Sequence, residues 1–237
     1  MKRSREWPGV SLVVCTNRPV FFDNLLANFR RQRYPRKELV IVLNNDRMNV
    51  EEYRRRTQGM PQVAVYQVPE RISLGQSLNC GIQKTRYPLI AKFDDDDYYS
   101  PDYLQEQVGA LLRTGSDIVG KHACLVYLEG TRQLLIRSPH EKNKQVEFVQ
   151  GGTILFRRSV LRQVWFPDKS VGEDVGFLTA CRTKGFKTYA TSPYRYVYIR
   201  RKNKQSHTWR AKDDFYRNGS IPLAVTDDYR GVAAFRG

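Results

Sequence analysis

An apolar segment that runs directly into four consecutive carboxylates constrains this chain more than any other feature. Leu89 to Phe93 indicates a buried strand, and Asp94 to Asp97 follow it without a break. Burying even one carboxylate is costly unless it is paired or bound to a metal, so the arrangement indicates a cation site at the carboxyl end of the strand. Its hard oxygen ligands favour Mg²⁺ or Mn²⁺. A solvated acidic turn that caps the next helix is the alternative, because runs of like charge are usually solvated.

Short β-branched apolar runs alternate with segments of helical spacing in the first half of the chain. Strands are predicted over 10–15, 38–43, 62–68 and 88–93, and helices over 21–32, 50–58 and 74–83. This order predicts an α/β fold with a mostly parallel sheet covered by helices on both faces. Ligands of such sheets bind beyond the carboxyl ends of the strands. Those ends are polar here, and they read Thr16-Asn17-Arg18, Asn44-Asn45-Asp46 and Asp94 to Asp97.

The second half is less regular. A helix is predicted over 101–113, a hairpin over 118–128 and 133–136, a strand led by glycines over 151–156, and two last strands over 186–190 and 194–199. Gly172-Glu173-Asp174 places two acids at the start of an amphipathic helix, where the helix dipole favours them. From Arg200 onward the chain is basic and has few core signals. We therefore expect one domain over 1–199 and a basic tail over 200–237 that acts as a lid or contacts the acceptor or a membrane.

Charge and cysteine usage bear on partners and compartment. The 237 residues carry 40 basic and 24 acidic side chains, a net charge of +16. This points to a nucleic acid, an anionic membrane face or a phosphorylated small molecule as partner. The four cysteines form no Cys-x-x-Cys pair, which makes zinc improbable and favours a cytoplasmic compartment. No apolar run approaches the roughly 20 residues of a membrane span.

The order of the motifs resembles glycosyltransferase family 2 with the GT-A fold. The motifs are the strand ends with Thr-Asn and Asn-Asn-Asp, then Leu-Gly-x-x-x-Asn-x-Gly-Ile, Asp-x-Asp-Asp-x-x-x-Pro-Asp-x-Leu, Gly-Gly-Thr and Gly-Glu-Asp. The resemblance runs from about Val10 to Ala190. It implies a Rossmann-like single domain that transfers a sugar, with inversion, from a nucleotide diphosphate sugar to an acceptor hydroxyl. It also implies a divalent metal, Mn²⁺ or Mg²⁺, and a UDP-sugar is the favoured donor.

The resemblance assigns roles by position. Asp96 corresponds to the metal ligand, and His207 to a histidine that reaches the metal or diphosphate in some relatives. Asp174 corresponds to the catalytic base, with Glu173 as its neighbour. The remaining matches are donor-binding residues, with either Asn44 or Asp46 as the contact to the base: Thr16, Asn17, Arg18, Asn44, Asp46, Asn79, Lys92, Asp94 and Asp95. Simple helix-start, capping or surface roles remain compatible with Glu173, Asp174, Thr16, Asn17, Asn79 and His207.

Two other functions are weighed against the glycosyltransferase. A sugar-phosphate nucleotidyltransferase shares the architecture but opens with a glycine-rich basic loop, and Cys15-Thr16-Asn17-Arg18 has no glycine. A basic protein that binds nucleic acid or another polyanion, with a degenerate donor site, is prompted by the net charge but has no recognisable module. We expect a carbohydrate, lipid-linked or polymer acceptor, no specific nucleic acid, and a cytoplasmic protein that is peripheral at the inner face of the membrane.

Overall fold

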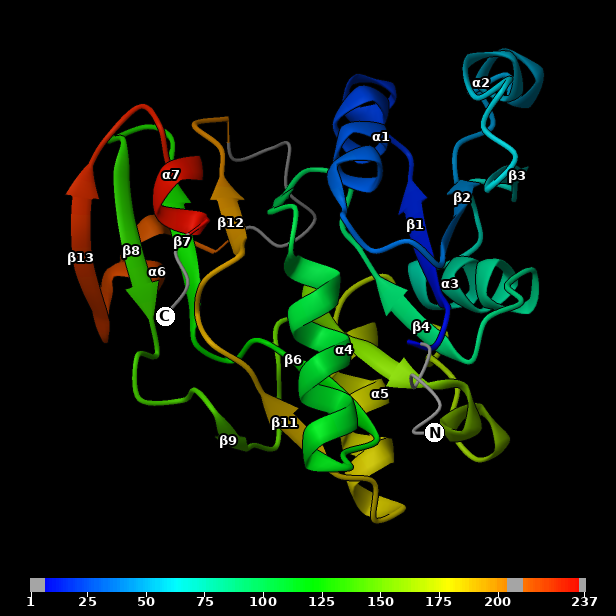
Figure 1. Cartoon of the computed structure of the whole chain (residues 1–237). Helices are drawn as coiled ribbons and strands as arrows, with labels where there is room; N and C mark the ends of the chain where they lie inside the picture. The colour runs from blue at the N-terminus through cyan, green and yellow to red at the C-terminus, as the bar shows by residue number, and fades with distance from the viewer. Residues whose placement is uncertain (1–6, 204–210, 235–237) are drawn as a thin grey trace, which may run out of the picture.

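The computed structural model describes residues 7–203 and 211–234, which form two sheets with helices around them (Figure 1). The larger sheet has eight strands in this part of the chain, in the order β3-β2-β1-β4-β10-β6-β11-β9. Their bounds are β1 Val10–Thr16, β2 Lys37–Leu43, β3 Val63–Gln67, β4 Leu89–Lys92, β6 Ile118–Gly120, β9 Lys144–Gln145, β10 Leu155–Arg157 and β11 Thr188–Ala190. Strands β1 to β4 run parallel, whereas β10 is antiparallel to both β4 and β6. The predicted α/β organisation is confirmed.

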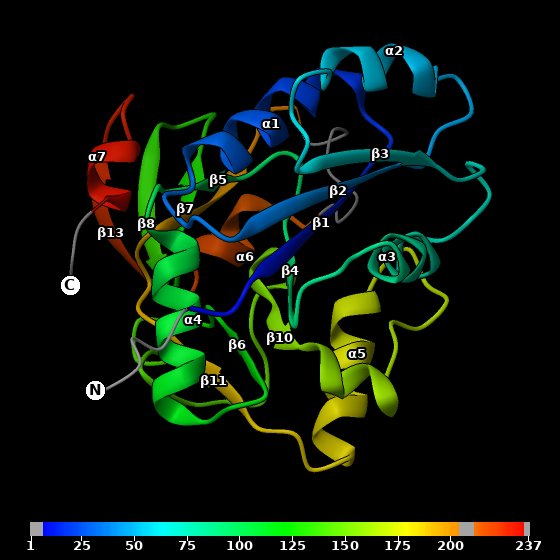
Figure 2. The ribbon, with the colours of Figure 1, turned by 45° about the vertical axis from the view of Figure 1, so that its right-hand side comes forward.

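Helices cover both faces of this sheet (Figure 2). They are α1 Phe22–Arg31, α2 Val50–Arg56, α3 Leu74–Gln83, α4 Tyr103–Thr114 and α5 Glu173–Thr183, with 3₁₀ turns η1 Pro19–Phe21, η2 Gly151–Thr153 and η3 Arg158–Arg162. Side chains alternate along β1, so Leu12 packs in the core cluster with α1, α2 and α4, while Val13 packs in the one with α3 and α5. None of the helices in the described part of the chain is long and apolar enough to cross a membrane.

A second sheet, which the sequence did not predict, stands beside the first. Its order within the described residues is β13-β8-β7-β12-β5. The strands are β5 Tyr98–Tyr99, β7 Cys124–Leu128, β8 Gln133–Arg137, β12 Tyr196–Arg200 and β13 Ser220–Val225. The β7–β8 hairpin agrees with the prediction. The strand expected over 118–128, however, is two strands in different sheets, separated at 121–123.

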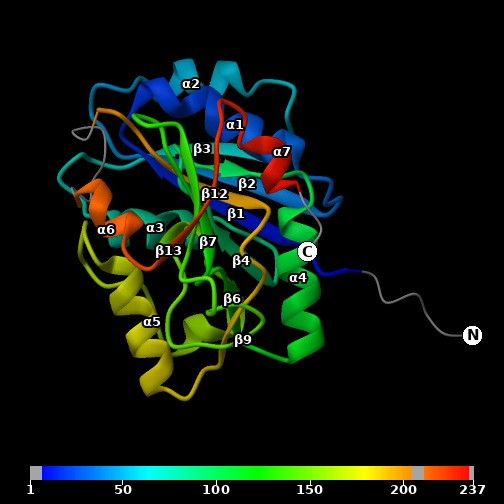
Figure 3. The same cartoon turned by 90° about the vertical axis from the view of Figure 1, so that its left-hand side faces the viewer.

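The described part of the segment beyond residue 199 belongs to this second sheet rather than to a separate tail. β13 pairs antiparallel with β8 and forms the outer edge of the sheet, at the front of Figure 3. Helices α6 Asp213–Arg217 and α7 Arg230–Ala233 flank the sheet, and Tyr216 and Ala233 are buried. The side chain of Arg200 is fully buried. The sequence hid this packing because the segment is basic overall and its few apolar residues are short and scattered.

Candidate functional site

The carboxyl ends of β1, β2 and β4 meet at one edge of the larger sheet, beside a cavity of about 620 Å³. Parallel pairing aligns Thr16 with Leu43, and the backbone N–H of Phe93 bonds to the carbonyl of Val13. This register carries the acid run past the end of β1. The hydroxyl of Thr16 consequently donates to Asp95, 2.6 Å away. The polar strand ends therefore converge as the sequence predicts.

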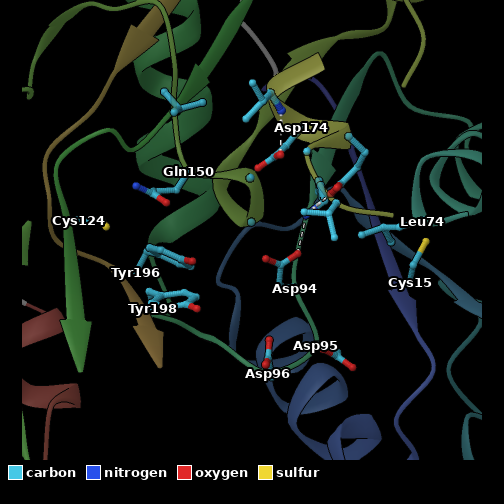
Figure 4. Close-up of a pocket in the computed structure, with 18 of the residues that line it drawn as sticks. Cys15, Leu74, Asp94, Asp95, Asp96, Cys124, Gln150, Asp174, Tyr196 and Tyr198 are labelled. Atoms are coloured by element: carbon cyan, nitrogen blue, oxygen red, sulfur yellow. Dashed lines mark hydrogen bonds and ion pairs between the residues drawn. The ribbon is translucent and has the colours of Figure 1, made fainter. Parts of the chain in front are cut away.

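The four carboxylates of the acid run differ in direction. Asp94 and Asp96 line the cavity, and Figure 4 shows them between its two walls. Asp94 accepts from the ammonium of Lys92 at 2.6 Å. Asp96 accepts from guanidinium nitrogens of Arg18 at 3.0 Å and of Arg201 at 2.7 Å. Asp96 is 8% exposed, so its carboxylate is surrounded by paired charge rather than by bulk water.

Asp95 and Asp97 are directed into the protein. Asp95, which also touches the cavity, is held by Thr16 and by the guanidinium of Arg18. Burial and repulsion from Asp96 raise the pKa of Asp95 to about 6 despite those bonds. Asp97 is almost fully buried and accepts from the hydroxyl of Tyr196 at 2.5 Å and the N–H of Ile199 at 3.0 Å. Three of the four carboxylates are thus buried, so the alternative of a solvated acidic turn is wrong.

Lys92 connects the acid run to the start of α5. Its ammonium lies 2.6 Å from Asp94 and 3.8 Å from the carboxylate of Glu173. Burial opposes the charge on Lys92, but Asp94 and Glu173 outweigh it and raise the pKa of the lysine. Burial in turn raises the pKa of Glu173, against the attraction of Lys92. The lysine therefore fixes two segments that lie about 80 residues apart in the sequence.

Asp174 enters the cavity from the first turn of α5, behind Gly172, which caps the helix at φ 77°. One carboxylate oxygen of Asp174 accepts from the N–H of Val175 at 2.8 Å. The other lies so close to Gly151 that a Cβ on that glycine would stand 2.2 Å from it. Gly152 is similarly close to Asp94, at 2.6 Å. The Gly151-Gly152 turn thus lies against the carboxylates of both Asp174 and Asp94.

Most of the residues predicted for the site come together around the cavity. Those that line it are Thr16, Asn17, Arg18, Asn44, Lys92, Asp94, Asp95, Asp96, Glu173 and Asp174. Asn79 does not line it, because its amide bonds to the N–H and carbonyl of Phe166. Asp46 does not line it either and accepts from the N–H of Glu70. His207 lies outside the described residues.

The sequence missed the opposite wall of the cavity, which the second sheet provides. Its lining residues include His122, Cys124, Val126, Arg137, Tyr196, Tyr198 and Tyr216. Figure 4 shows Tyr196 and Tyr198 across the cavity from Cys15 and Leu74. The only local signal was the alternation in Tyr194 to Ile199, which indicates a strand but not its neighbours.

The acid run suits a divalent cation that is completed by a phosphorylated ligand. Among residues 7–203 and 211–234, no three His, Cys, Asp or Glu side chains converge as a ready-made metal cage. Mg²⁺ in phosphate sites commonly takes only one or two carboxylates, with substrate phosphates completing its shell. Asp96, supported by Asp94, provides such oxygens at the cavity wall. The residues therefore fit a cation that arrives with a diphosphate.

The α/β fold, with helices on both faces of a mostly parallel sheet, and the acidic strand end define a protein of the GT-A class. The family model described as glycosyl transferase family 2 matches residues 11–165, well over half of the chain. The chain belongs to this family. Comparison with the curated protein sequences gave no match.

Solved structures share the fold at low sequence identity. One is the mannosyltransferase PcManGT from Pyrobaculum calidifontis in complex with GDP-Man and Mn²⁺, with a TM-score of 0.65 and 20% identity over 84% of this chain and 59% of that one. Another is TarS 1-349 from S. aureus in complex with UDP-GlcNAc, with a TM-score of 0.67 and 17% identity over 88% of this chain and 64% of that one. The chain thus spans less than two thirds of the length of these two proteins.

Proposed function

We propose that the protein is an inverting glycosyltransferase that moves a sugar from a nucleoside diphosphate sugar to an acceptor hydroxyl. One observation carries the proposal: the carboxylates of Asp94 and Asp96 and that of Asp174 come from distant segments and line one cavity. Family membership supports a glycosyltransferase. The acid run binds the diphosphate of the donor, and Asp174 acts as the base for the acceptor hydroxyl.

Inversion needs a base on the face of the sugar opposite the leaving group. Asp174 accepts the proton of the attacking hydroxyl at its cavity-facing oxygen, while the N–H of Val175 holds its other oxygen in place. Glu173 lies beside Lys92 rather than at the centre of the cavity and orients this helix start. A divalent cation held by Asp96 and Asp94 would offset the charge that builds up on the leaving diphosphate.

The strand ends of β1 and β2 form the base-binding side of the cavity. Thr16, Asn17, Arg18 and Asn44 line it, whereas Asp46 is turned away toward Glu70. This placement favours Asn44 over Asp46 as the contact to the nucleobase. An amide both donates and accepts, which suits the imide edge of uracil, and a UDP-sugar remains the proposed donor.

Thermal melting with UDP, TDP and GDP, each with and without Mn²⁺, tests the donor site. A ligand that binds only the folded state at a hundredfold excess over its Kd stabilises it by about 2.7 kcal/mol. We expect UDP to raise Tm in a manner that needs the metal, and Asp96→Ala to abolish the metal-dependent part. Asp227→Ala, which removes an exposed carboxylate paired with Arg132, should keep it. No shift with any nucleotide in the wild-type protein would contradict the proposal.

A further inference from the structure

The wall of the cavity that the second sheet provides carries a positive charge that no carboxylate of the described residues neutralises. Arg137, the last residue of β8, lines this wall, and its guanidinium lies 4.3 Å from the ring centre of Phe215 and 5.4 Å from that of Tyr216. Among the described residues, no carboxylate pairs with Arg137. Aromatic faces hold a guanidinium in position but leave its N–H groups available.

The two arginines that hold the acid run differ from Arg137 in this respect. Arg18 pairs with Asp95 and Asp96, and Arg201 pairs with Asp96. Their charge is therefore already committed to the acid run. A partly buried guanidinium without a carboxylate, such as Arg137, is favourable mainly where an anionic ligand completes it.

His122 contributes a second available polar group to the same wall. It lines the cavity, and its Nδ1 is buried without a hydrogen-bond partner in the part of the chain that the structure describes. The segment that holds it is fixed near the catalytic end of the cavity, because the N–H of Gln150 bonds to the carbonyl of Lys121 at 2.8 Å. Gly151, the next residue, lies against Asp174. The wall with Arg137 and His122 therefore borders the part of the cavity that Asp174 lines, where the acceptor is proposed to bind.

We propose that the acceptor is an anionic sugar whose phosphate or carboxylate binds Arg137, with His122 as a second polar contact. Tyr198, which is half-buried on the same wall, then packs against the sugar ring. This inference rests on the proposed glycosyl transfer. In that reaction the C1–O bond to the diphosphate breaks and a bond from C1 to the acceptor oxygen forms. The hydroxyl proton passes to Asp174, and the bonding electron pair leaves with the nucleoside diphosphate.

Binding measurements on the nucleotide-loaded protein test the anionic acceptor. The protein is first saturated with Mn²⁺ and the nucleotide that raises its Tm, so that the diphosphate site is filled. Glucose, glucose 6-phosphate and glucuronic acid are then titrated by calorimetry. We expect at least one anionic sugar to bind ten or more times as tightly as glucose. Whichever of glucose 6-phosphate and glucuronic acid binds more tightly shows whether the site prefers a phosphate or a carboxylate. Equal affinity for glucose and both anionic sugars would overturn the inference.

Substitution of Arg137 identifies the residue responsible. Arg137→Gln should lower the affinity for the preferred anionic sugar at least tenfold and leave the affinity for glucose and the nucleotide unchanged, because a lost contact to a charged group costs roughly that much. Arg132→Gln, at the exposed end of the same hairpin, is the matched loss of one charge. If Arg137→Gln changes the affinity for the anionic sugar no more than Arg132→Gln does, or lowers the affinity for the nucleotide instead, the inference fails while the donor site stands. If the wild-type protein binds no nucleotide, the proposed function itself fails.

Discussion

The two walls of the cavity use their charged groups in opposite ways. On the wall of the larger sheet, Arg18 and Lys92 are both paired with carboxylates of the acid run or of α5. On the wall of the second sheet, Arg137 lies over aromatic rings with no carboxylate beside it in the described residues. On the first wall, the basic side chains can move from their carboxylates to a diphosphate when a metal and a diphosphate bind. On the second wall, a cation without a carboxylate favours ligands that carry a negative charge.

Asp174 stands between the walls, and its substitution should have the largest effect. Asp174→Asn keeps the size of the side chain but removes the ability to take a proton, and general-base assistance is typically worth about 10² to 10⁴ in rate. We expect turnover to fall by that factor while the Tm shift caused by the nucleotide is retained. Single-turnover transfer from radiolabelled donor measures the first, and thermal melting the second.

Asp168→Asn makes the same chemical change on an exposed residue that accepts from Gln76, and it should leave turnover unchanged. Wild-type turnover in Asp174→Asn would remove Asp174 as the base. Loss of the Tm rise caused by the nucleotide in that variant would instead mean that Asp174 binds the donor, and the division of the cavity into a donor wall and an acceptor wall would be wrong.

Asp97 joins the walls, and its loss should appear in stability. Asp97 lies between β4 of the larger sheet and β5 of the second sheet, and its carboxylate accepts from the hydroxyl of Tyr196 and the N–H of Ile199, both on β12. Asp97→Ala leaves two buried donors unsatisfied at about 1–3 kcal/mol each. Removing a buried carboxylate, whose pKa burial raises, offsets part of that cost. We expect the free energy of unfolding to fall by about 2–4 kcal/mol, measured by urea denaturation.

Asp97→Asn is the matched variant, because its amide oxygen can still accept one of the two bonds. It should lose less than half as much stability as Asp97→Ala. Equal stability of Asp97→Ala and wild type would mean that the two sheets are held together elsewhere.

The wall of the larger sheet could be predicted from the sequence, because each of its parts is local. A buried strand and the polar residues at its end are contiguous, and parallel pairing brings such ends to one edge. The sequence did not reveal which of the four aspartates face the cavity. That choice depends on α1, where Asn24 donates to the carbonyls of Asp95 and Asp97 and Asn28 donates to that of Asp97.

The wall of the second sheet could not be predicted, because its strands pair across long stretches of sequence. Tyr99 pairs with Tyr196, and Ile221 pairs with Ile136. The strands are also as short as two residues, so hydrophobic periodicity is weak in each one. Arg137 and His122 consequently carried no sequence signal of a site. The placements of Asn79 and Asp46 outside the cavity depend in the same way on distant backbone groups, those of Phe166 and Glu70.

Gly151 lies where the two walls meet, and its substitution should have a smaller effect than that of Asp174 itself. A Cβ at this position would stand 2.2 Å from the carboxylate of Asp174, and the mobile end of that side chain has to move aside. Misplacing a catalytic group by about 1 Å can cost up to about 10² in rate. We expect Gly151→Ala to lower turnover about 10- to 100-fold with an unchanged nucleotide shift. Gly231→Ala, whose Cβ would meet nothing closer than 3.9 Å, is the control.

Combining Gly151→Ala with Asp174→Asn should lower turnover little beyond Asp174→Asn alone, because both substitutions act through one carboxylate. If the two losses multiply instead, Gly151 acts on the acceptor directly, and the turn belongs to the second wall rather than to the base.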